Sequence, residues 1–246
     1  MLVNKSNLLL QGEDKEKVII TEAISNVIYK IEHKDNYSGV VNLNGDDITI
    51  TNLTIQNTFG KDAPDSVRYE YKDAKSGQAK SVTAARTAHQ FALRGFKSTR
   101  LKVINCILLA WGADTVSPWD SHEGMYYFKD CVMQGGVDFY CPRGWAYAED
   151  CTFICQSGTA AIWHDGSENK NMKSVWKNCK FVGEKTYKLG RYHHDSQFYL
   201  INCSFDENMQ NARIYKAQTA GPCLLGAKGI LLQLPQKRRR LRLVQE

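Results

Sequence analysis

The chain has 246 residues, of which 43% are hydrophobic and 24% are charged, and its formal net charge is +6. This composition suits a globular protein with a large core, and no apolar run is long enough for a membrane helix. Residues 221–246 hold six of the Lys and Arg residues against one Glu, so residues 1–220 carry a net charge of only +1. Because the body is nearly neutral, we expect no nucleic-acid or membrane partner for it, and a nucleic-acid-binding function would rest on the tail alone.

The first residues, "MLVNKSNLLLQGEDKEK", have a polar break after three positions and only a short apolar patch. A signal peptide has a longer uninterrupted apolar run, so this start does not have its pattern. We therefore expect either a protein that stays inside the cell or a sequence whose true beginning is absent.

Six short segments share a pattern of Asn or Asp, then Cys or Leu, then a variable residue, then an apolar one. The segments are TNLTI (51–55), INCIL (104–108), KDCVM (129–133), EDCTF (149–153), KNCKF (177–181) and INCSF (201–205). The cysteines of the last five segments are separated by 25, 20, 28 and 24 residues. An irregular period of this length with short alternating strands is typical of a solenoid.

We therefore predict an all-β fold, a single-stranded right-handed parallel β-helix in which each repeat forms one coil. The repeated cysteines would stack in an internal ladder, since free cysteine packs as a small apolar side chain. A disulfide framework is the alternative, and Cys141 and Cys155, which lie outside the repeat, could pair.

The spacing of the repeat changes between Leu53 and Cys106, which are 53 residues apart, about the length of two ordinary coils. The intervening stretch "GKDAPDSVRYEYKDAKSGQAKS" is polar. We expect a polar loop over about residues 60–82 that leaves a coil, and long loops on rigid scaffolds often carry binding function.

Two aspartates follow neighbouring repeats at nearly the same distance. Asp114 lies eight residues after Cys106, and Asp138 lies seven after Cys131. If the cysteines are in register, both carboxylates occupy nearly the same place on consecutive coils, about 4.8 Å apart along the helix axis. Their pKa values should then split, so that one acts as a nucleophile or base and the other as an acid. Ordinary solvated aspartates at polar turns are the alternative interpretation.

The motifs "HQFALR" (89–94), "ADT" (113–115), "GGVDF" (135–139) and "LGR" (189–191) resemble those of the pectin methylesterases. The corresponding family motifs are roughly Q-A-V-A-L-R, Q-D-T, G-x-V-D-F and L-G-R-P-W, and the resemblance runs from about residue 7 to 216. It implies a right-handed parallel β-helix and a pectinesterase-like carboxylic ester hydrolase that removes methyl esters from pectin-like polygalacturonate and releases methanol. It further implies a secreted or periplasmic enzyme without metal or cofactor, and we expect a monomer.

The resemblance also implies roles for four side chains. Asp138 would attack the ester carbonyl as nucleophile, and Asp114 would act as general acid and then as general base. Gln90 would donate a hydrogen bond to the oxyanion, and Arg191 would hold Asp138 ionised. Each role has an ordinary alternative, such as backbone bonding for Gln90 and a surface ion pair for Arg191.

Three departures from the family motifs bear on the substrate. Ala113 replaces the Gln of Q-D-T, Tyr192-His193 replaces the Pro-Trp after L-G-R, and "YCPRG" follows Phe139. Aromatic and cationic side chains near these positions would line an altered cleft and hold sugar rings and free carboxylates. The predicted substrate-binding residues are Arg143, Trp145, Trp163, His164 and His193.

After residue 220 the repeat stops, so we predict an esterase domain over 1–220 and an atypical basic tail over 221–246. The tail could be amphipathic or could cap the solenoid. A third possibility is a frameshift in the coding sequence of the tail. Codons can be chosen for residues 228–246 such that translation after a one-base shift gives another aromatic strand followed by Asn-Cys, which is the missing repeat. We therefore expect a β-helix that is truncated at both ends. The alternative function is a non-catalytic carbohydrate-binding β-helix or an inactive esterase fragment.

Overall fold

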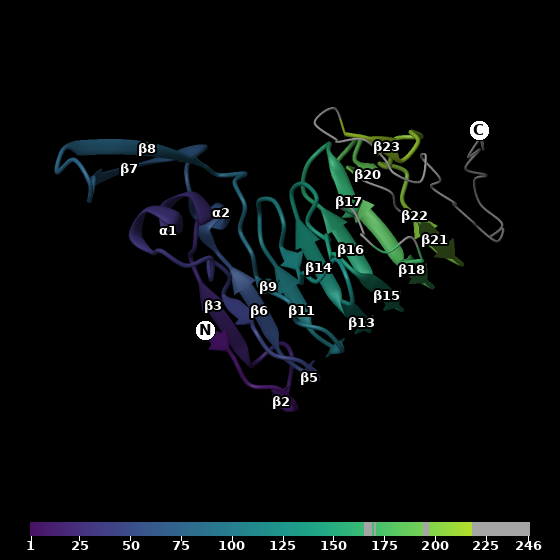
Figure 1. Ribbon diagram of the computed structural model, residues 1–246. Helices are drawn as coiled ribbons and strands as arrows, with labels where there is room; N and C mark the ends of the chain where they lie inside the picture. Colours follow the sequence, from purple (N-terminus) through teal and green to yellow (C-terminus); the bar gives the residue numbers. More distant parts are fainter. Residues whose placement is uncertain (165–168, 170, 194–196, 218–246) are drawn as a thin grey trace.

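Short runs of β-branched and aromatic residues, punctuated by single Asn or Asp residues, wind the chain into a right-handed parallel β-helix. This confirms the predicted fold class. The computed structural model describes residues 1–164, 169, 171–193 and 197–217. In Figure 1 the coils succeed one another from left to right, from the N-terminal strands to β21 and β22. The predicted tail over 221–246 lies outside the described residues.

Each full coil contributes a strand to three parallel sheets, which we call sheets A, B and C. Sheet B contains β2 (Leu8–Gln11), β5 (Ile48–Thr51), β10 (Leu101–Ile104), β13 (Met125–Lys129), β15 (Trp145–Glu149), β18 (Ser174–Lys177) and β21 (Phe198–Ile201). Sheet C contains β3 (Ile19–Glu22), β6 (Thr54–Asn57), β11 (Ile107–Leu109), β14 (Val132–Gly135), β16 (Thr152–Cys155), β19 (Lys180–Gly183) and β22 (Ser204–Phe205).

Sheet A is formed by two sets of strands that meet at Tyr140. One set is β1 (Leu2–Val3), β4 (Val41–Leu43), β9 (Leu93–Gly95) and β12 (Val116–Ser117), and the other is β17 (Ala160–His164), β20 (Lys188–Tyr192) and β23 (Tyr215–Lys216). Parallel bridges from Val116 to Tyr140 and from Tyr140 to Ile162 join the two sets. The sheet therefore continues along the coils that carry the candidate aspartates.

The repeated Asn or Asp makes the turn from sheet B to sheet C. These residues have positive φ angles between 52° and 56°, and they are Asn52, Asn105, Asp130, Asp150, Asn178 and Asn202. Asn and Asp adopt this left-handed conformation more readily than other residues with a side chain. Their side chains also bond from coil to coil, since Asn105 Nδ2 donates to Asn52 Oδ1 at 2.8 Å and Asn178 Nδ2 donates to Asp150 Oδ1 at 3.2 Å.

The predicted cysteine ladder is confirmed. The five repeated cysteines are buried, and four of their thiols donate to backbone carbonyls of the preceding coil, as in Cys131 Sγ to Val103 O at 3.4 Å and Cys203 Sγ to Trp176 O at 3.4 Å. All seven cysteines among the described residues are free, including Cys141 and Cys155. Aromatic rings stack beside the ladder, with Phe153 and Phe181 centroids 4.9 Å apart. Each such buried ring contributes about 1.5–3 kcal/mol to stability.

The segment expected to be a polar loop is instead largely ordered secondary structure. It contains α2 (Phe59–Asp62) and an antiparallel hairpin, β7 (Ser66–Lys72) and β8 (Ala79–Ala85), which extends away from the coils in Figure 1. A second short helix, α1 (Asn26–Glu32), lies beside the hairpin. Because β5 pairs directly with β10, the gap of two repeat lengths is a single coil with an insertion.

No helix among the described residues is long and apolar enough to cross a membrane.

Candidate active site

Asp114 and Asp138 lie at equivalent positions on consecutive coils, in the turns that lead from sheet C to sheet A. Val116 and Tyr140, each two residues further on, pair in parallel, and Asp114 N donates to Val137 O at 3.3 Å. This confirms the equivalence that the spacing predicted. Both aspartates have positive φ angles, 61° for Asp114 and 47° for Asp138.

The surrounding sequence explains why these turns can be so tight. The Cα of Gly135 lies so close to Phe139 that a Cβ atom at this position would overlap the phenyl side chain. Phe139 can therefore fold into the core while Asp138 faces the other way. Non-glycine residues in the left-handed region are uncommon and tend to occur at functional sites.

Asp138 is buried and forms an ion pair with an arginine from two coils further along. Arg191 lies on β20 in register with Trp163 of β17, and β17 pairs with the coil of Asp138 through Tyr140. Its Nε atom donates to both carboxylate oxygens of Asp138 at 3.0 Å, and its Nη2 atom donates to Oδ2. The predicted contact between Arg191 and Asp138 is thus present, and it fixes the orientation of the carboxylate.

The carboxylate of Asp138 ionises less readily than a free one. Only 3% of the residue is exposed, and this burial raises its pKa to about 6 in spite of the opposing ion pair with Arg191. The negative charge of Asp114 also raises the pKa of Asp138, while the charge of Arg143 lowers it. At neutral pH most of Asp138 is therefore ionised, as a nucleophile or base must be.

Asp114 is also buried, with 5% of the residue exposed, and its basic neighbours lie farther from it than Arg191 lies from Asp138. His89 Nε2 lies 3.7 Å from its Oδ1 atom, and Arg143 Nη2 lies 4.0 Å from its Oδ2 atom. The Oδ1 atom accepts no hydrogen bond from the part of the chain that the structure describes. The two carboxyl groups thus have different environments, one tightly paired and one loosely paired.

Arg143 is enclosed rather than exposed to solvent. Only 3% of it is exposed, and its guanidinium lies between two indoles, 4.3 Å from the ring centroid of Trp119 and 4.6 Å from that of Trp163. Its Nη1 atom donates to Ser117 Oγ at 3.2 Å and to the carbonyl of Cys141 at 2.8 Å. The structure therefore places Arg143 beside Asp114, and its contact with a substrate carboxylate stays a prediction.

Gln90 is completely buried, and its side-chain amide is bonded to the backbone. The Oε1 atom accepts from Gly60 N at 2.9 Å, and the Nε2 atom donates to the carbonyl of Arg86. Gln90 also lies on the coil before that of Asp114, since its backbone N donates to Ala113 O at 2.9 Å. Its amide nitrogen keeps a second hydrogen that this carbonyl does not take.

The remaining predicted substrate residues divide between two places. Trp163 and His193 lie together, with ring centroids 4.5 Å apart, and Trp163 contacts both Arg143 and Arg191. Trp145 lies on β15 and lines a groove on the outer face of sheet B, so the structure does not bring it together with the aspartates. The backbone of His164 belongs to β17, but its side chain lies outside what the structure describes.

Two residues near the aspartates were not assigned a role from the sequence. His89 approaches Asp114, and Trp119, 42% exposed, covers Arg143. Trp119 follows Asp114 by five residues, as Arg143 follows Asp138, and the two form a parallel bridge. This equal offset is the feature of the sequence that could have placed Trp119 next to Arg143. Among the described residues, no group of three or more His, Cys, Asp or Glu side chains gathers as metal ligands do.

The chain is similar in sequence to plant pectinesterases. It is 26% identical over 197 residues to putative pectinesterase 14 of Arabidopsis thaliana, covering 76% of this chain and 50% of that protein. It is 27% identical over 189 residues to pectinesterase 31 of the same plant, covering 73% of this chain and 50% of that protein. The chain thus spans about half the length of these curated relatives. No protein-family model matches it.

Solved structures of pectin methylesterases share its fold. PemA from Erwinia chrysanthemi superimposes with a TM-score of 0.64 at 21% identity, over 85% of this chain and 67% of that one. The enzyme from Yersinia enterocolitica superimposes with a TM-score of 0.59 at 17% identity, over 96% of this chain and 89% of that one. The curated sequence relatives are pectinesterases, and the solved structures show that the chain has the parallel β-helix fold of the pectin methylesterases.

Proposed function

We propose that the chain hydrolyses methyl esters of a pectin-like polygalacturonate and releases methanol. The observation that carries this proposal is the pairing of two buried carboxyl groups on consecutive coils, of which Asp138 alone is bound by Arg191. Two carboxyl groups in different environments can supply a nucleophile and an acid at the same pH. The sequence relatives, which are pectinesterases, support the same reaction.

The first half of the reaction forms a covalent intermediate. A carboxylate oxygen of Asp138 attacks the ester carbonyl carbon, and the carbonyl electron pair moves to the oxygen. When the tetrahedral intermediate collapses, the bond to the methoxy oxygen breaks, and Asp114 gives its proton to that oxygen so that methanol leaves. The product is a mixed anhydride between the uronate and Asp138. Arg191 holds the attacking carboxylate ionised and in one orientation.

The second half restores the enzyme. Asp114, now ionised, takes a proton from a water molecule whose oxygen attacks the anhydride. The anhydride bond breaks, the uronate leaves as a free carboxylic acid that ionises, and Asp138 is again a carboxylate. Arg143, held between Trp119 and Trp163, lies close enough to Asp114 to stabilise its negative charge in this step. Gln90 would use its second amide hydrogen to stabilise the oxyanion.

The chemistry of the surroundings and the solved neighbours support a pectin-like substrate. Pectin methylesterases with this fold have been crystallised with hexasaccharides. Trp163 and His193 would contact the sugar rings next to the reacting ester. Because such a polymer belongs to the cell wall, the enzyme would act outside the cytoplasm. We further propose that it acts as a monomer.

Methanol release tests the proposed reaction. The purified chain is incubated with highly methylated pectin and, as the matched blank, with the same polymer after complete de-esterification. We expect methanol from the first substrate and none from the second. A folded chain that releases no methanol from any methylated uronate polymer would contradict the proposal.

A binding protein without catalysis is the second candidate, and two observations favour it. Ala113 offers no side-chain donor to an oxyanion, and the amide of Gln90 is already bonded to Gly60 and Arg86. Binding of methylated pectin measured by affinity electrophoresis, with no methanol released, would support this candidate instead.

A further inference from the structure

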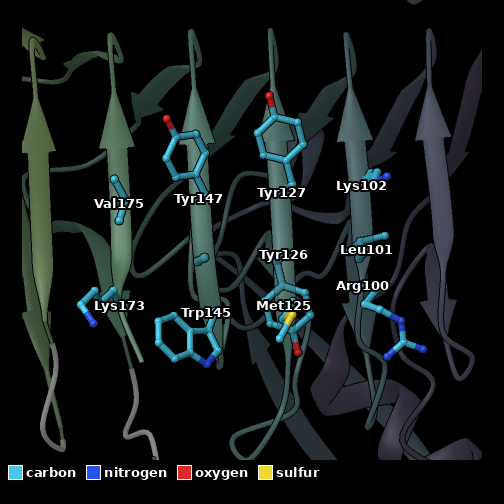
Figure 2. A pocket seen from close by; sticks show the side chains of 11 residues that line it. Arg100, Leu101, Lys102, Met125, Tyr126, Tyr127, Trp145, Tyr147, Lys173 and Val175 are labelled. Carbon is cyan, nitrogen blue, oxygen red and sulfur yellow. The ribbon is translucent and has the colours of Figure 1, made fainter. Parts of the chain in front are cut away.

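The outer face of sheet B carries a groove of about 600 Å³ that the proposed reaction does not use. It runs across the strands β10, β13, β15 and β18, and Figure 2 shows the side chains that line it. Asp138 lies instead in the turn before sheet A, so the groove lies on a different face of the solenoid. Concave apolar surfaces with a few polar groups are the usual places for ligands.

Three aromatic side chains form the floor of this groove, and we call Tyr127, Tyr147 and Trp145 the aromatic platform. Tyr127 and Tyr147 are register partners on β13 and β15, with ring centroids 5.8 Å apart and planes inclined by 28°. Trp145 is the register partner of Met125 on the same two strands. Figure 2 looks onto the sheet and shows these three rings face-on, so their faces point outward from the sheet.

Positive charges border the platform. Lys102 on β10 is the register partner of Tyr127, and Lys173, just before β18, places its ammonium 5.0 Å from the ring centroid of Trp145. Arg100 also lines the groove, but Asp47 holds it through contacts of 2.6 and 2.7 Å. Among the described residues that line the groove none is acidic, and Glu149, which accepts a hydrogen bond from the Tyr127 hydroxyl at 3.1 Å, is paired with Lys177 at 2.8 Å. The Lys173 ammonium donates one hydrogen bond to the carbonyl of Asn171 at 2.9 Å and keeps two further N–H donors, so both lysines can still donate to an anionic ligand.

We propose that this groove binds an anionic polysaccharide, a chain of uronic acid residues that lies across the strands. Pyranose rings present flat apolar C–H faces, which match exposed aromatic faces on neighbouring strands. Uronate carboxylates at the edges of the chain would form charge-assisted hydrogen bonds with Lys102 and Lys173. The site would hold the protein on its polymer while the separate Asp138 site acts on an ester.

The charges favour this ligand over a second copy of the chain. A symmetric dimer through the groove would bring Lys102 and Lys173 of one copy against the same lysines of the other, because a two-fold interface pairs each surface with itself. The described lining residues include no carboxylate, and the nearby Glu149 is already paired with Lys177, so such a partner surface does little to neutralise the lysines.

The site can be tested by calorimetric titration of the full chain with oligomers of fully de-esterified galacturonate. Tyr147→Ala removes the centre of the platform, and the double variant Lys102→Gln with Lys173→Gln removes its charges. We expect the first to weaken oligomer binding to this site at least tenfold, and the second to weaken it about fivefold and to reduce its salt dependence. Tyr199→Ala, on the same face of sheet B but outside the groove, is the matched control and should bind like the parent.

Several outcomes would overturn the site. The groove does not bind uronate if both platform variants, folded by circular dichroism, keep the parent's affinity, or if a neutral glucan binds as tightly as the uronate oligomer. A concentration-dependent dimer that Tyr147→Ala dissolves would show self-association instead. The titration uses no methyl ester and so needs no catalysis, and because the platform variants leave Trp163 and His193 unchanged, any oligomer bound at the Asp138 site contributes equally to the parent and the variants. Methanol release tests the proposed reaction separately. Tyr147→Ala should release methanol from methylated pectin oligomers at the parent's kcat.

Discussion

Asp138 combines burial with an ion pair, and its titration should govern the reaction on the acid side. The acid limb of kcat/KM reports the ionisation of an essential group in the free enzyme. Since the pKa of Asp138 is raised to about 6, we expect kcat/KM for methanol release to fall as the pH decreases through about 6. Arg191→Gln removes the ion pair that opposes burial, so the limb should move to higher pH by about one unit or more.

The control for this profile is Arg213→Gln, which removes an exposed arginine of the described chain. Methanol release is followed from pH 4.5 to 8 for the parent and both variants. A parent rate that stays constant down to pH 4.5, or an Arg191→Gln profile that superimposes on that of the parent, would contradict the assigned role of the pair.

The same titration affects stability. Because the folded protein binds a proton at Asp138 more tightly than the unfolded chain does, the parent is stabilised by this group below pH 3.8 and loses that stability as the pH rises through about 6. Asp138→Asn cannot titrate. The free energy of unfolding of the variant relative to the parent should therefore increase between pH 3.5 and 7, by up to about 3 kcal/mol for a shift of about two units. Urea titrations of the parent and the variant at both pH values measure this difference. A difference in the free energy of unfolding that is the same at pH 3.5 and pH 7 would refute the raised pKa of Asp138.

At the residue scale, the sequence located the aspartates but not their surroundings. Asp114 and Asp138 could be paired because both follow a repeated cysteine at a similar distance. The burial of Arg143 could not be predicted, because a one-dimensional spacing does not show which side chain fills the space between two indoles. The reach of Arg191 across the coil of Trp163 to Asp138 was implied only by the family resemblance.

At the scale of individual elements, the stability of each turn between sheets B and C depends on its Asn or Asp residue, which has a positive φ angle. Asn178 is exposed with a φ of 54°, and both alanine and glycine remove its hydrogen bond to Asp150, so the backbone conformation distinguishes the two replacements. We expect Asn178→Ala to be less stable than Asn178→Gly by about 1 kcal/mol, because alanine has a Cβ that opposes this conformation and glycine does not. Urea unfolding of both variants checks this, and equal stabilities would contradict it.

The repeat was predictable at the scale of elements because one requirement recurs in every coil. A residue that tolerates positive φ must precede a small buried one, and Asn or Asp followed by Cys meets both needs. The hairpin β7–β8 was not predicted because its strands bury little, so the sequence has no strong apolar alternation there. Trp145 was assigned to the cleft because its distance from Asp138 along the chain does not reveal that a new sheet begins at that residue.

At the scale of the whole molecule, the coils and the inserted hairpin should be energetically separate. The hairpin hydrogen-bonds to α1 through Tyr69, whose hydroxyl donates to Glu32 at 2.5 Å on the exposed surface. Replacing residues 68–83 by an Asn-Gly turn that joins Val67 to Ala84, which already pair, should leave the β-sheet circular dichroism unchanged. The thermal midpoint should move by only a few degrees. Tyr69→Phe is the control for the hydrogen bond, and loss of the β-sheet signal would show that the hairpin supports the coils.

The central claim is that Asp138 acts as the nucleophile of an esterase, and one comparison tests it most directly. Methanol release from highly methylated pectin is measured at pH 7.5 for the parent and for Asp138→Asn, with circular dichroism of both. The asparagine keeps the shape of the side chain but cannot form the anhydride, so we expect methanol from the parent and a rate reduced at least a thousandfold, roughly the size of losses seen when a catalytic nucleophile is removed, in a variant that is equally folded. A folded Asp138→Asn variant that releases methanol at a rate similar to that of the parent would contradict the account.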